Sequence, residues 1–364
     1  MTDMKFAGRP RGGFPSRRMT GRAASAALLL ACLFALGPYV LCADKTDTVV
    51  LKNGDRITGE IRSLTNGLLT YKTDDIGTLS VEWERVVRIS STWLFIVEDT
   101  HGKRHTGALQ EASETGKVVV RTGEGPVTLD LVEIVSVARF GERLIQRFHG
   151  TLDVGFSLQK ANKNTQLNLG AGLNYVTTKW DIRAELNSYY AKQESVPSTM
   201  KILVSLSTMR VFANRWTATA LAQVEQNTEL NLDARLLGGA GVGRYFIRTN
   251  RHVLNGIVAV DVTQENYIDE TPPTTGMEAV IGVNYQTFRY VFPNLDISAS
   301  AYAYPSLTTK GRVRATFQAN IRYELFLRFY VSVAFVDNYD SKPGGETTTK
   351  NDYGLTFGIS WSLN

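Results

Sequence analysis

The clearest pattern in the chain is an alternation of hydrophobic and polar residues that begins near residue 150 and continues to the end. Successive side chains of a β-strand point to opposite faces, so this alternation predicts strands with one apolar and one polar face. The last strand shows it best, with one face made of Tyr353, Leu355, Phe357, Ile359, Trp361 and Leu363. Twelve such segments start near residues 150, 165, 179, 200, 215, 235, 252, 277, 294, 311, 325 and 352.

The connections between these segments alternate in length. Long polar connections cover residues 160–165, 194–199, 226–233, 265–276, 305–311 and 340–350, whereas tight turns centre on Thr177-Thr178, Asn214, Thr249-Asn250, Pro293-Asn294 and Glu324. An even number of strands of about ten residues with alternating short turns and long loops is typical of bacterial outer-membrane β-barrels. We therefore predict an all-β chain whose residues 148–364 form an antiparallel transmembrane barrel of about twelve strands.

A soluble β-sandwich would alternate in the same way. Aromatic residues gather near strand ends, as expected at membrane interfaces, and the predicted interface aromatics are Trp180, Trp216, Phe357 and Trp361. The polar face also carries too many charges for a sandwich core. These two features favour the barrel.

Residues 46–140 contain a repeat of different texture, with copies at about 46–92 and 94–140. At an offset of 48 residues, Gly54, Arg56, Thr58, Gly59 and Val87 match Gly102, Arg104, Thr106, Gly107 and Val135. Each copy predicts a small antiparallel β-unit that is too small to bury a good core alone, so the two should pack together in the periplasm. The shared Gly and Thr residues are interpreted as turn chemistry, and a binding groove stays open as an alternative.

The first 43 residues predict a secretory signal peptide. Basic residues precede an apolar run from Ala23 to Leu36, and cleavage is expected after Ala43. Removing this stretch leaves 34 basic and 34 acidic residues, so the excess positive charge belongs to the leader and nucleic-acid binding is not expected. Both cysteines, Cys32 and Cys42, lie in the leader as well, which excludes disulfides and thiol chemistry from the mature chain.

Charged residues on the polar face are the candidate lumen-lining residues: Arg183, Glu185, Asp261, Asp296, Arg312, Arg314, Arg322 and Arg328. One interpretation is a network of ion pairs that fills a narrow barrel. The other is an anion-biased constriction lined by arginines.

No catalytic, cofactor-binding or metal site is predicted. His101 and His105 have the spacing of a helical zinc motif, but the local pattern is a hairpin, so both are interpreted as solvated turn residues. No Ser/His pair shares an outward face at the height of the external membrane leaflet, and His252 is expected at the periplasmic end. A lipid-modifying enzyme is therefore a distant third hypothesis.

The segment from Val49 to Gly59 (VVLKNGDRITG), with Val81-Glu82-Trp83 behind it and the alternating C-terminal half, resembles the salt-induced outer-membrane β-barrel family, domain of unknown function 481. The resemblance extends over most of residues 46–364 and implies an outer-membrane location without an established activity. Barrels of this kind usually end on an aromatic residue that the barrel-assembly machinery reads. Here Phe357 and Trp361 are expected to provide that signal.

Two function classes follow. The first is a small-solute or ion channel, porin-like, with outer-membrane lipid as its surroundings and the periplasmic domain as gate or docking platform. The second is a non-conducting structural or interaction protein whose repeats bind another component of the cell envelope.

Overall fold

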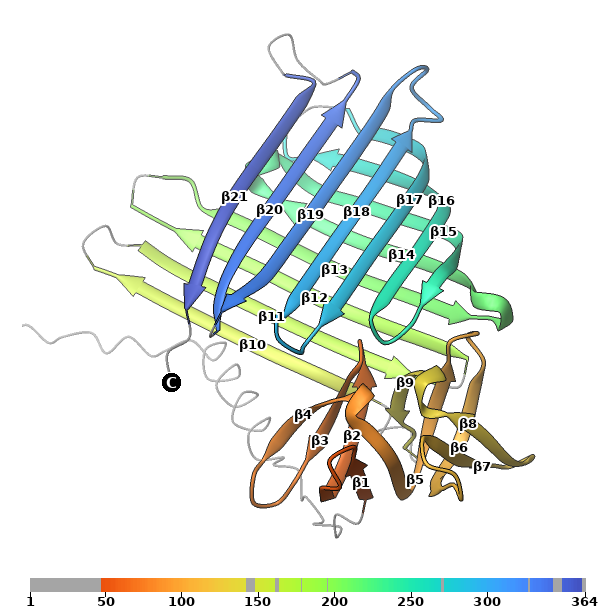
Figure 1. Ribbon diagram of the computed structural model, residues 1–364. Coiled ribbons are helices and arrows are strands. Elements are labelled where there is room, and N and C mark those ends of the chain that lie inside the picture. The colour runs from red at the N-terminus through yellow and green to blue at the C-terminus, as the bar shows by residue number, and fades with distance from the viewer. Residues whose placement is uncertain are drawn as a thin grey trace, which may run out of the picture. The chain divides into compact units, whose positions relative to one another are not determined.

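The computed structural model describes residues 47–141, 148–160, 164–177, 179–194, 196–269, 272–326, 328–342 and 349–361. The predicted signal peptide lies outside these residues. The described chain forms two antiparallel β-sheets (Figure 1), so the prediction of an all-β protein is confirmed. Among the described residues, no helix is long and apolar enough to span a membrane.

The first sheet has nine strands and makes up the N-domain, residues 47–141. Its strands are β1 (Asp47–Leu51), β2 (Arg56–Thr65), β3 (Leu68–Lys72), β4 (Thr78–Glu82), β5 (Val86–Asp99), β6 (Arg104–Glu111), β7 (Lys117–Thr122), β8 (Gly125–Asp130) and β9 (Ile134–Arg139). Neighbouring strands follow the order β4-β3-β2-β1-β5-β6-β7-β8, and β9 pairs with both β2 and β5. Since β1 also joins β2 to β5, these four strands close into a small barrel.

The internal repeat is visible in this geometry. The 3-10 turns η1 (Trp83–Arg85) and η2 (Leu131–Glu133) lie 48 residues apart, and Gly54 and Gly102 both adopt positive φ, 91° and 81°, in equivalent turns. Glycine is the residue that tolerates this conformation best. The 14-residue strand β5 belongs to both copies, because its first half pairs with β1 and its second half pairs with β6.

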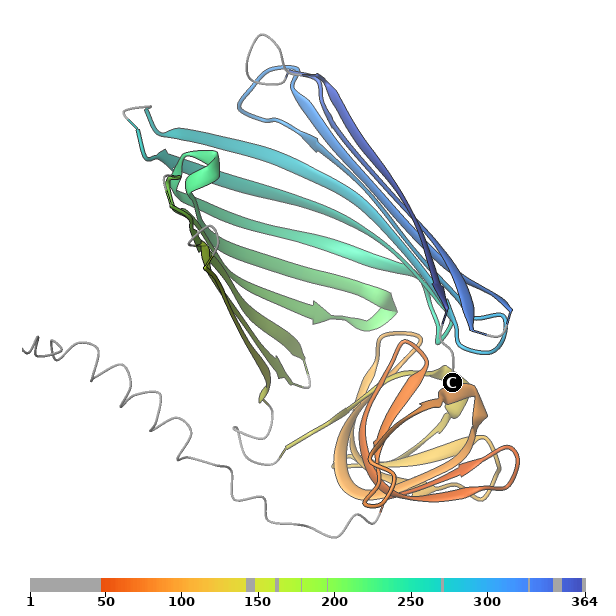
Figure 2. The same ribbon diagram turned by 90° about the vertical axis from the view of Figure 1, so that its left-hand side faces the viewer.

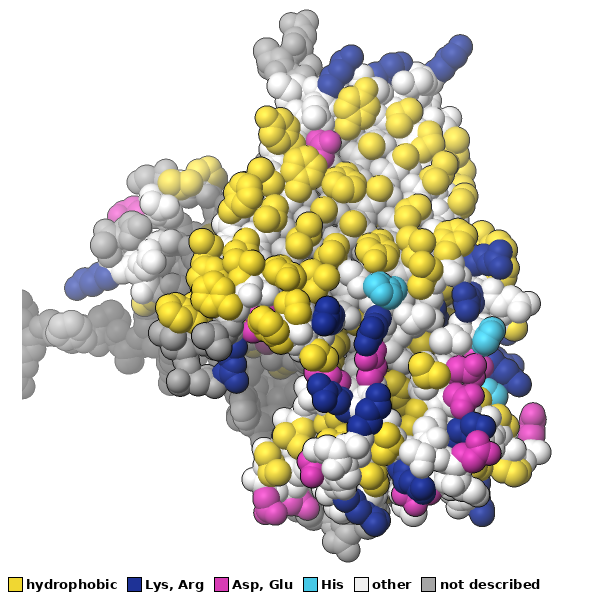
Figure 3. Space-filling model, viewed as in Figure 1, with side chains coloured by type: hydrophobic (Ala, Val, Ile, Leu, Met, Phe, Trp, Pro, Cys, Tyr) yellow, Lys and Arg dark blue, Asp and Glu magenta, His cyan; other side chains and the backbone are white. Residues whose placement is uncertain are grey.

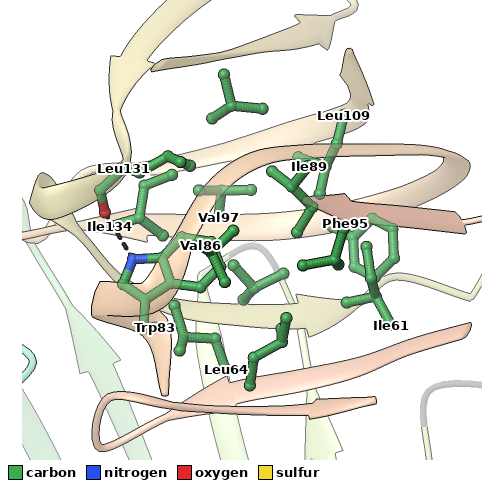
Figure 4. Packing of buried hydrophobic residues seen from close by; sticks show 14 of the residues in the cluster. Ile61, Leu64, Trp83, Val86, Ile89, Phe95, Val97, Leu109, Leu131 and Ile134 are labelled. Carbon is green, nitrogen blue, oxygen red and sulfur yellow. Dashed lines mark hydrogen bonds between the residues drawn. The ribbon is translucent and has the colours of Figure 1, made fainter. Parts of the chain in front are cut away.

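The main hydrophobic core lies in the N-domain and draws on both repeats (Figure 4). Ile61, Leu64 and Phe95 are fully buried in it. The indole Nε1 of Trp83 donates a hydrogen bond of 2.6 Å to the carbonyl oxygen of Leu131, its counterpart in the second repeat. The two units therefore share one core, as the sequence predicted from their small size.

The second sheet has twelve strands, and we call it the twelve-strand sheet. They are β10 (Phe148–Gln159), β11 (Asn164–Val176), β12 (Trp180–Lys192), β13 (Thr199–Val211), β14 (Trp216–Asn227), β15 (Leu232–Arg248), β16 (His252–Tyr267), β17 (Thr274–Arg289), β18 (Leu295–Pro305), β19 (Val313–Phe326), β20 (Phe329–Asp340) and β21 (Asn351–Trp361). Each strand pairs with its sequence neighbour, and all twelve begin within about four residues of the predicted starts. Short turns follow β11, β13, β15, β17 and β19 and define the short-turn end, while the other connections define the long-loop end.

The strand register separates two faces. One row of paired residues, Ile297, Ile321, Val333 and Phe357, belongs to the outward face, and the row Ser298, Asn320, Ala334 and Thr356 belongs to the inward face. Hydrophobic side chains cover the outward face of β17–β21 (Figure 3). The sheet curves strongly from the yellow-green β10 to the blue β21 (Figure 2), and no pairing joins these two strands in the part of the chain described. Strand number, faces and loop rhythm make this an outer-membrane β-barrel type of fold.

Candidate functional site

Six of the eight predicted lumen-lining residues lie within strands on the inward face: Arg183, Glu185, Asp261, Asp296, Arg314 and Arg322. The other two lie outside strands. Arg312 directly precedes β19, and Arg328 occupies the turn after it with a positive φ of 62°. Arg328 fits the alternation of the sequence, but the backbone reverses direction there. The amide N–H of Arg328 donates to the carboxylate of Glu324.

The arginines toward the long-loop end are bound to carboxylates. Arg314 forms a bidentate pair with Glu278, and Arg312 donates to both carboxylate oxygens of Asp340, at 2.6 Å for its closest contact. Sequence reasoning did not single out Arg235, which bridges two acids on flanking strands: its guanidinium lies 2.9 Å from Glu225 and 2.8 Å from Glu265. These pairs neutralise the arginines, as in the ion-pair interpretation.

The remaining predicted residues are less tightly paired. Arg322 lies opposite Asp296 in the register and stacks over the ring of Tyr330, 4.3 Å from its centroid. The Nε of Arg183 donates to Asn174 at 3.0 Å and lies 3.9 Å from Glu185. These residues lie on the inward face without forming one cluster.

Acidic residues outnumber basic residues on the inward face of the strands described. The register places Asp153, Asp181, Glu185, Glu225, Asp261, Glu265, Glu278, Asp296, Glu324, Asp340 and Asp352 there. The basic residues in the same rows are Arg183, Lys201, Arg235, Arg248, Arg314 and Arg322. The arginines therefore do not give this face an excess of positive charge.

A buried charge network joins the N-domain to the short-turn end of the twelve-strand sheet. Arg104 on β6 forms a bidentate pair with Asp181 on β12, at 3.0 and 2.6 Å, and its Nε donates to Glu98 on β5 at 3.1 Å. Glu98 also lies 2.5 Å from Nη1 of Arg248 on β15. The side chains of Arg104 and Glu98 are 9% and 4% exposed, so these charges depend on one another for compensation. Burial disfavours the charge on Arg104, but its hydrogen bonds to Asp181 and the charge of Glu98 outweigh this and raise its pKa.

Sequence reasoning missed this network. The repeat matched Arg104 with Arg56, which is exposed in the structure, and the spacing does not distinguish the two environments.

Further contacts connect the N-domain to the short turns. The guanidinium of Arg215 donates to the carbonyl oxygen of Thr100 at 2.8 Å, and its amide N–H donates to the carbonyl oxygen of His101 at 3.2 Å. The side chain of Asn250 donates to the carbonyl oxygen of Ile134 at 2.6 Å. Arg251 and Glu84 form an exposed bidentate pair, and the hydrogen bonds to Arg251 lower the pKa of Glu84.

A cavity of about 690 Å³ lies between the N-domain and the inward face. Its lining includes Arg62 and Arg139 from the N-domain and His149, Arg183 and Asp181 from the twelve-strand sheet. Glu60 pairs with both N-domain arginines, at 2.9 Å for Arg62. The cavity thus lies at the short-turn end, and both parts of the chain contribute charged and apolar residues to its lining.

Three of the predicted interface aromatics mark one level of the sheet. Trp180 and Trp216 begin β12 and β14, and Trp361 ends β21, so all three lie at the short-turn end. Their side chains are exposed, and the guanidiniums of Arg210 and Arg244 lie 5.5 and 5.4 Å from the rings of Trp180 and Trp216. Phe357 is exposed on the outward face farther from this end.

The histidine interpretation needs a correction. His101 lies in a turn, but His105 lies on β6 and is only 6% exposed, with Nε2 3.9 Å from Asp99. Burial lowers the pKa of His105, so it packs as a neutral side chain and is not a solvated turn residue. Within the residues described, no group of three or more His, Cys, Asp or Glu side chains is placed to hold a metal ion.

Among solved structures, the beta domain of the Bordetella autotransporter BrkA is similar over 58% of this chain and 96% of that chain, with 11% sequence identity and a TM-score of 0.31. A likeness at this level carries no inference about function. No curated protein matches. The model of the family "Protein of unknown function, DUF481" matches residues 152–361, and this match does not include the segment from Val49 to Gly59. Since the match spans more than half of the chain, the protein belongs to the DUF481 family.

Proposed function

We propose that the protein is an outer-membrane channel for small solutes or ions, with the N-domain on the periplasmic side as a gate. One observation carries the proposal: the twelve-strand sheet has a mostly apolar outward face and a polar inward face that carries most of its charged residues. A sheet of this kind suits lipid on one side and water on the other.

A channel requires a closed barrel, and we propose that β10 and β21 pair with each other in the membrane. The sheet is antiparallel with an even number of strands, so its first and last strands run in opposite directions. Unpaired backbone groups at a sheet edge are costly in hydrocarbon, which favours such pairing. The outward residues of both strands, including Leu152 and Phe357, would then continue the apolar band.

The gating role rests on the network at the short-turn end. Arg104 and Glu98 come from the N-domain, and they bind Asp181 and Arg248 of the inward face. A domain held by these contacts lines a cavity together with the inward face at this end. Movement of the N-domain would change access without any change in the strands.

The charges support a cation preference in place of the anion bias expected from the arginines. Arg314 is bound to Glu278, Arg235 to two acids, and carboxylates outnumber basic groups on this face. Rings of carboxylates favour cations in pores.

The test is single-channel conductance of the refolded chain without residues 1–43 in a planar bilayer, with a salt gradient to read ion preference. We expect openings with cation preference, and Glu278→Gln should weaken that preference. Asp130→Asn is the matched control, because it removes the same charge from β8 of the N-domain, outside the twelve-strand sheet. Anion preference, or unchanged selectivity in Glu278→Gln, would contradict the charge assignment.

The second candidate is a non-conducting envelope protein whose N-domain binds a partner. The buried ion pairs of Arg104 with Glu98 and Asp181 favour this candidate, because they would hold the N-domain fixed against the twelve-strand sheet. An inserted protein that stays silent in the bilayer, including in a variant lacking Arg104, would overturn the channel and support this alternative.

A further inference from the structure

Asp337 on β20 breaks the apolar pattern of the outward face. It pairs with Phe317 of β19 and Tyr353 of β21, both outward residues, and it is the one acidic residue that the described register places on this face. Every other acid in the register of these strands points inward. An ionisable side chain facing lipid is unfavourable unless it has a partner, so such a residue indicates a functional site.

Aromatic residues are the neighbours of Asp337 on the outward face of the sheet, both along its own strand and on the adjacent strands. Phe317 and Tyr353 are its cross-strand neighbours, and Phe335 and Tyr339 are its neighbours on the same face of β20. Cross-strand neighbours place their Cβ atoms about 4.5–5.5 Å apart. The rings of Phe317 and Phe335 are 5.9 Å apart. A carboxylate among aromatic faces is the arrangement that attracts an organic cation, because the ring faces are electronegative.

The carboxylate also opens on a groove. The Oδ1 atom of Asp337 is buried and has no hydrogen-bond partner. Asp337 lines a groove of about 400 Å³ whose lining also includes Ile281 and the small side chains Ala301, Ala303 and Ala315. The register places these residues on the outward face, so the groove is an apolar surface for a chain of methylene groups beside the Asp337 side chain.

The depth of the site matches the boundary of a membrane. Asp337 lies three residues before the end of β20 at Asp340, and the long-loop end begins there. At about 3.3 Å per residue, the carboxylate lies about 10 Å from that end. A charged head group and an acyl chain meet at this level of a bilayer.

We propose that Asp337 and its aromatic neighbours bind the ammonium head group of a lipid whose acyl chain lies along the alanine groove. A metal ion would find a single ligand side chain here, whereas an alkylammonium uses the carboxylate, the rings and the groove together. The site rests on the membrane placement proposed above and is independent of conduction.

The test uses the full chain without residues 1–43, refolded in dodecyl maltoside micelles and examined by native mass spectrometry. The probes are phosphatidylethanolamine and phosphatidylglycerol with identical acyl chains, and free ethanolamine. We expect phosphatidylethanolamine to bind at least tenfold more tightly than phosphatidylglycerol. Asp337→Asn should abolish this preference, Asp337→Glu should keep it, and the inward-facing control Asp352→Asn should leave it unchanged.

Equal binding of the two lipids, or a preference that survives Asp337→Asn, would overturn the site. Free ethanolamine binding as tightly as the lipid would assign the site to a soluble amine and overturn the lipid. Heat-modifiable gel migration and protease protection in vesicles report insertion separately. A chain that never inserts refutes the membrane placement and this site with it, while a silent channel that keeps the lipid preference refutes conduction alone.

Discussion

Replacing Arg104 with alanine should loosen the N-domain from the twelve-strand sheet. The change removes two hydrogen bonds to Asp181, one to Glu98 and one to the carbonyl oxygen of Thr177. Breaking a buried ion pair costs about 3–5 kcal/mol. The lower end applies here, because Asp181 is 29% exposed and can be rehydrated and because Glu98 keeps its contact with Arg248. We therefore expect a loss of about 3 kcal/mol in docking free energy, which is about a hundredfold in an equilibrium constant.

The amide of Arg215 reports this equilibrium directly. Its N–H donates to the carbonyl oxygen of His101 in the N-domain, so undocking exposes it to hydrogen exchange. The protection of this amide should fall about a hundredfold in Arg104→Ala. The amide of Phe212, which donates to Trp216 within the same turn, should keep its protection and serves as the internal control.

Arg251→Ala is the matched variant. Arg251 also links the two parts, through Glu84, but the two side chains are 61% and 43% exposed. Exposed pairs contribute about 0–1 kcal/mol, so protection at Arg215 should fall less than about fivefold. Equal losses in the two variants, or less than a threefold loss in Arg104→Ala, would refute the reasoning that burial makes the Arg104 network dominant.

The remaining predictions concern the N-domain, produced as segment 46–140, which its contiguous core predicts to fold alone. Gly59→Ala should lower its free energy of unfolding by about 1–3 kcal/mol, because the new Cβ would lie 2.5 Å from the carbonyl oxygen of Lys72, whereas Gly123→Ala meets no atom within 4 Å and should be neutral in thermal melts. Trp83→Phe leaves a buried carbonyl oxygen without its donor and should cost about 1–3 kcal/mol in urea unfolding; a neutral result would mean that water replaces the indole. Burial raises the pKa of Asp47, so its contribution to stability is greatest below its ordinary pKa of 3.8 and is lost as pH rises above it. The stability of wild type relative to Asp47→Asn should therefore decrease from about pH 3 to pH 7, and a constant difference would contradict the raised pKa.

The strands of the second sheet could be predicted because alternation is a local property. Each strand of 11 to 17 residues carries its own apolar and polar faces, and turns such as Thr249-Asn250 interrupt the pattern. The alternation predicts the ends of strands less accurately than their positions. Arg328, for example, fits the alternation but lies in a turn with positive φ. The alternation of apolar and polar residues does not by itself show where the backbone reverses direction.

The partners of charged residues could not be predicted in the same way. Alternation placed Arg314 on the inward face, but its pairing with Glu278, two strands away, depends on the stagger between strands. The Arg104 network joins residues 77 positions apart, and His105 is buried by long-range packing. Asp337 did carry a local signal, since it interrupts an apolar series between Phe335 and Tyr339, and its importance emerges once the neighbouring strands supply the other two rings.

The two sheets differ in how far apart in the sequence their pairing partners lie, and this sets an order of folding. In the twelve-strand sheet every pairing joins consecutive strands, so it can grow hairpin by hairpin from either end with little loop-closure entropy to overcome at each step. In the N-domain, β2 pairs with β9, whose Val137 lies 73 positions after its partner Leu64 in the chain. The small domain is therefore expected to complete its barrel through late, non-local pairings of β5 with β1 and of β9 with β2 and β5. The strands of the larger sheet are expected to pair by a succession of local steps, before the proposed closure between β10 and β21.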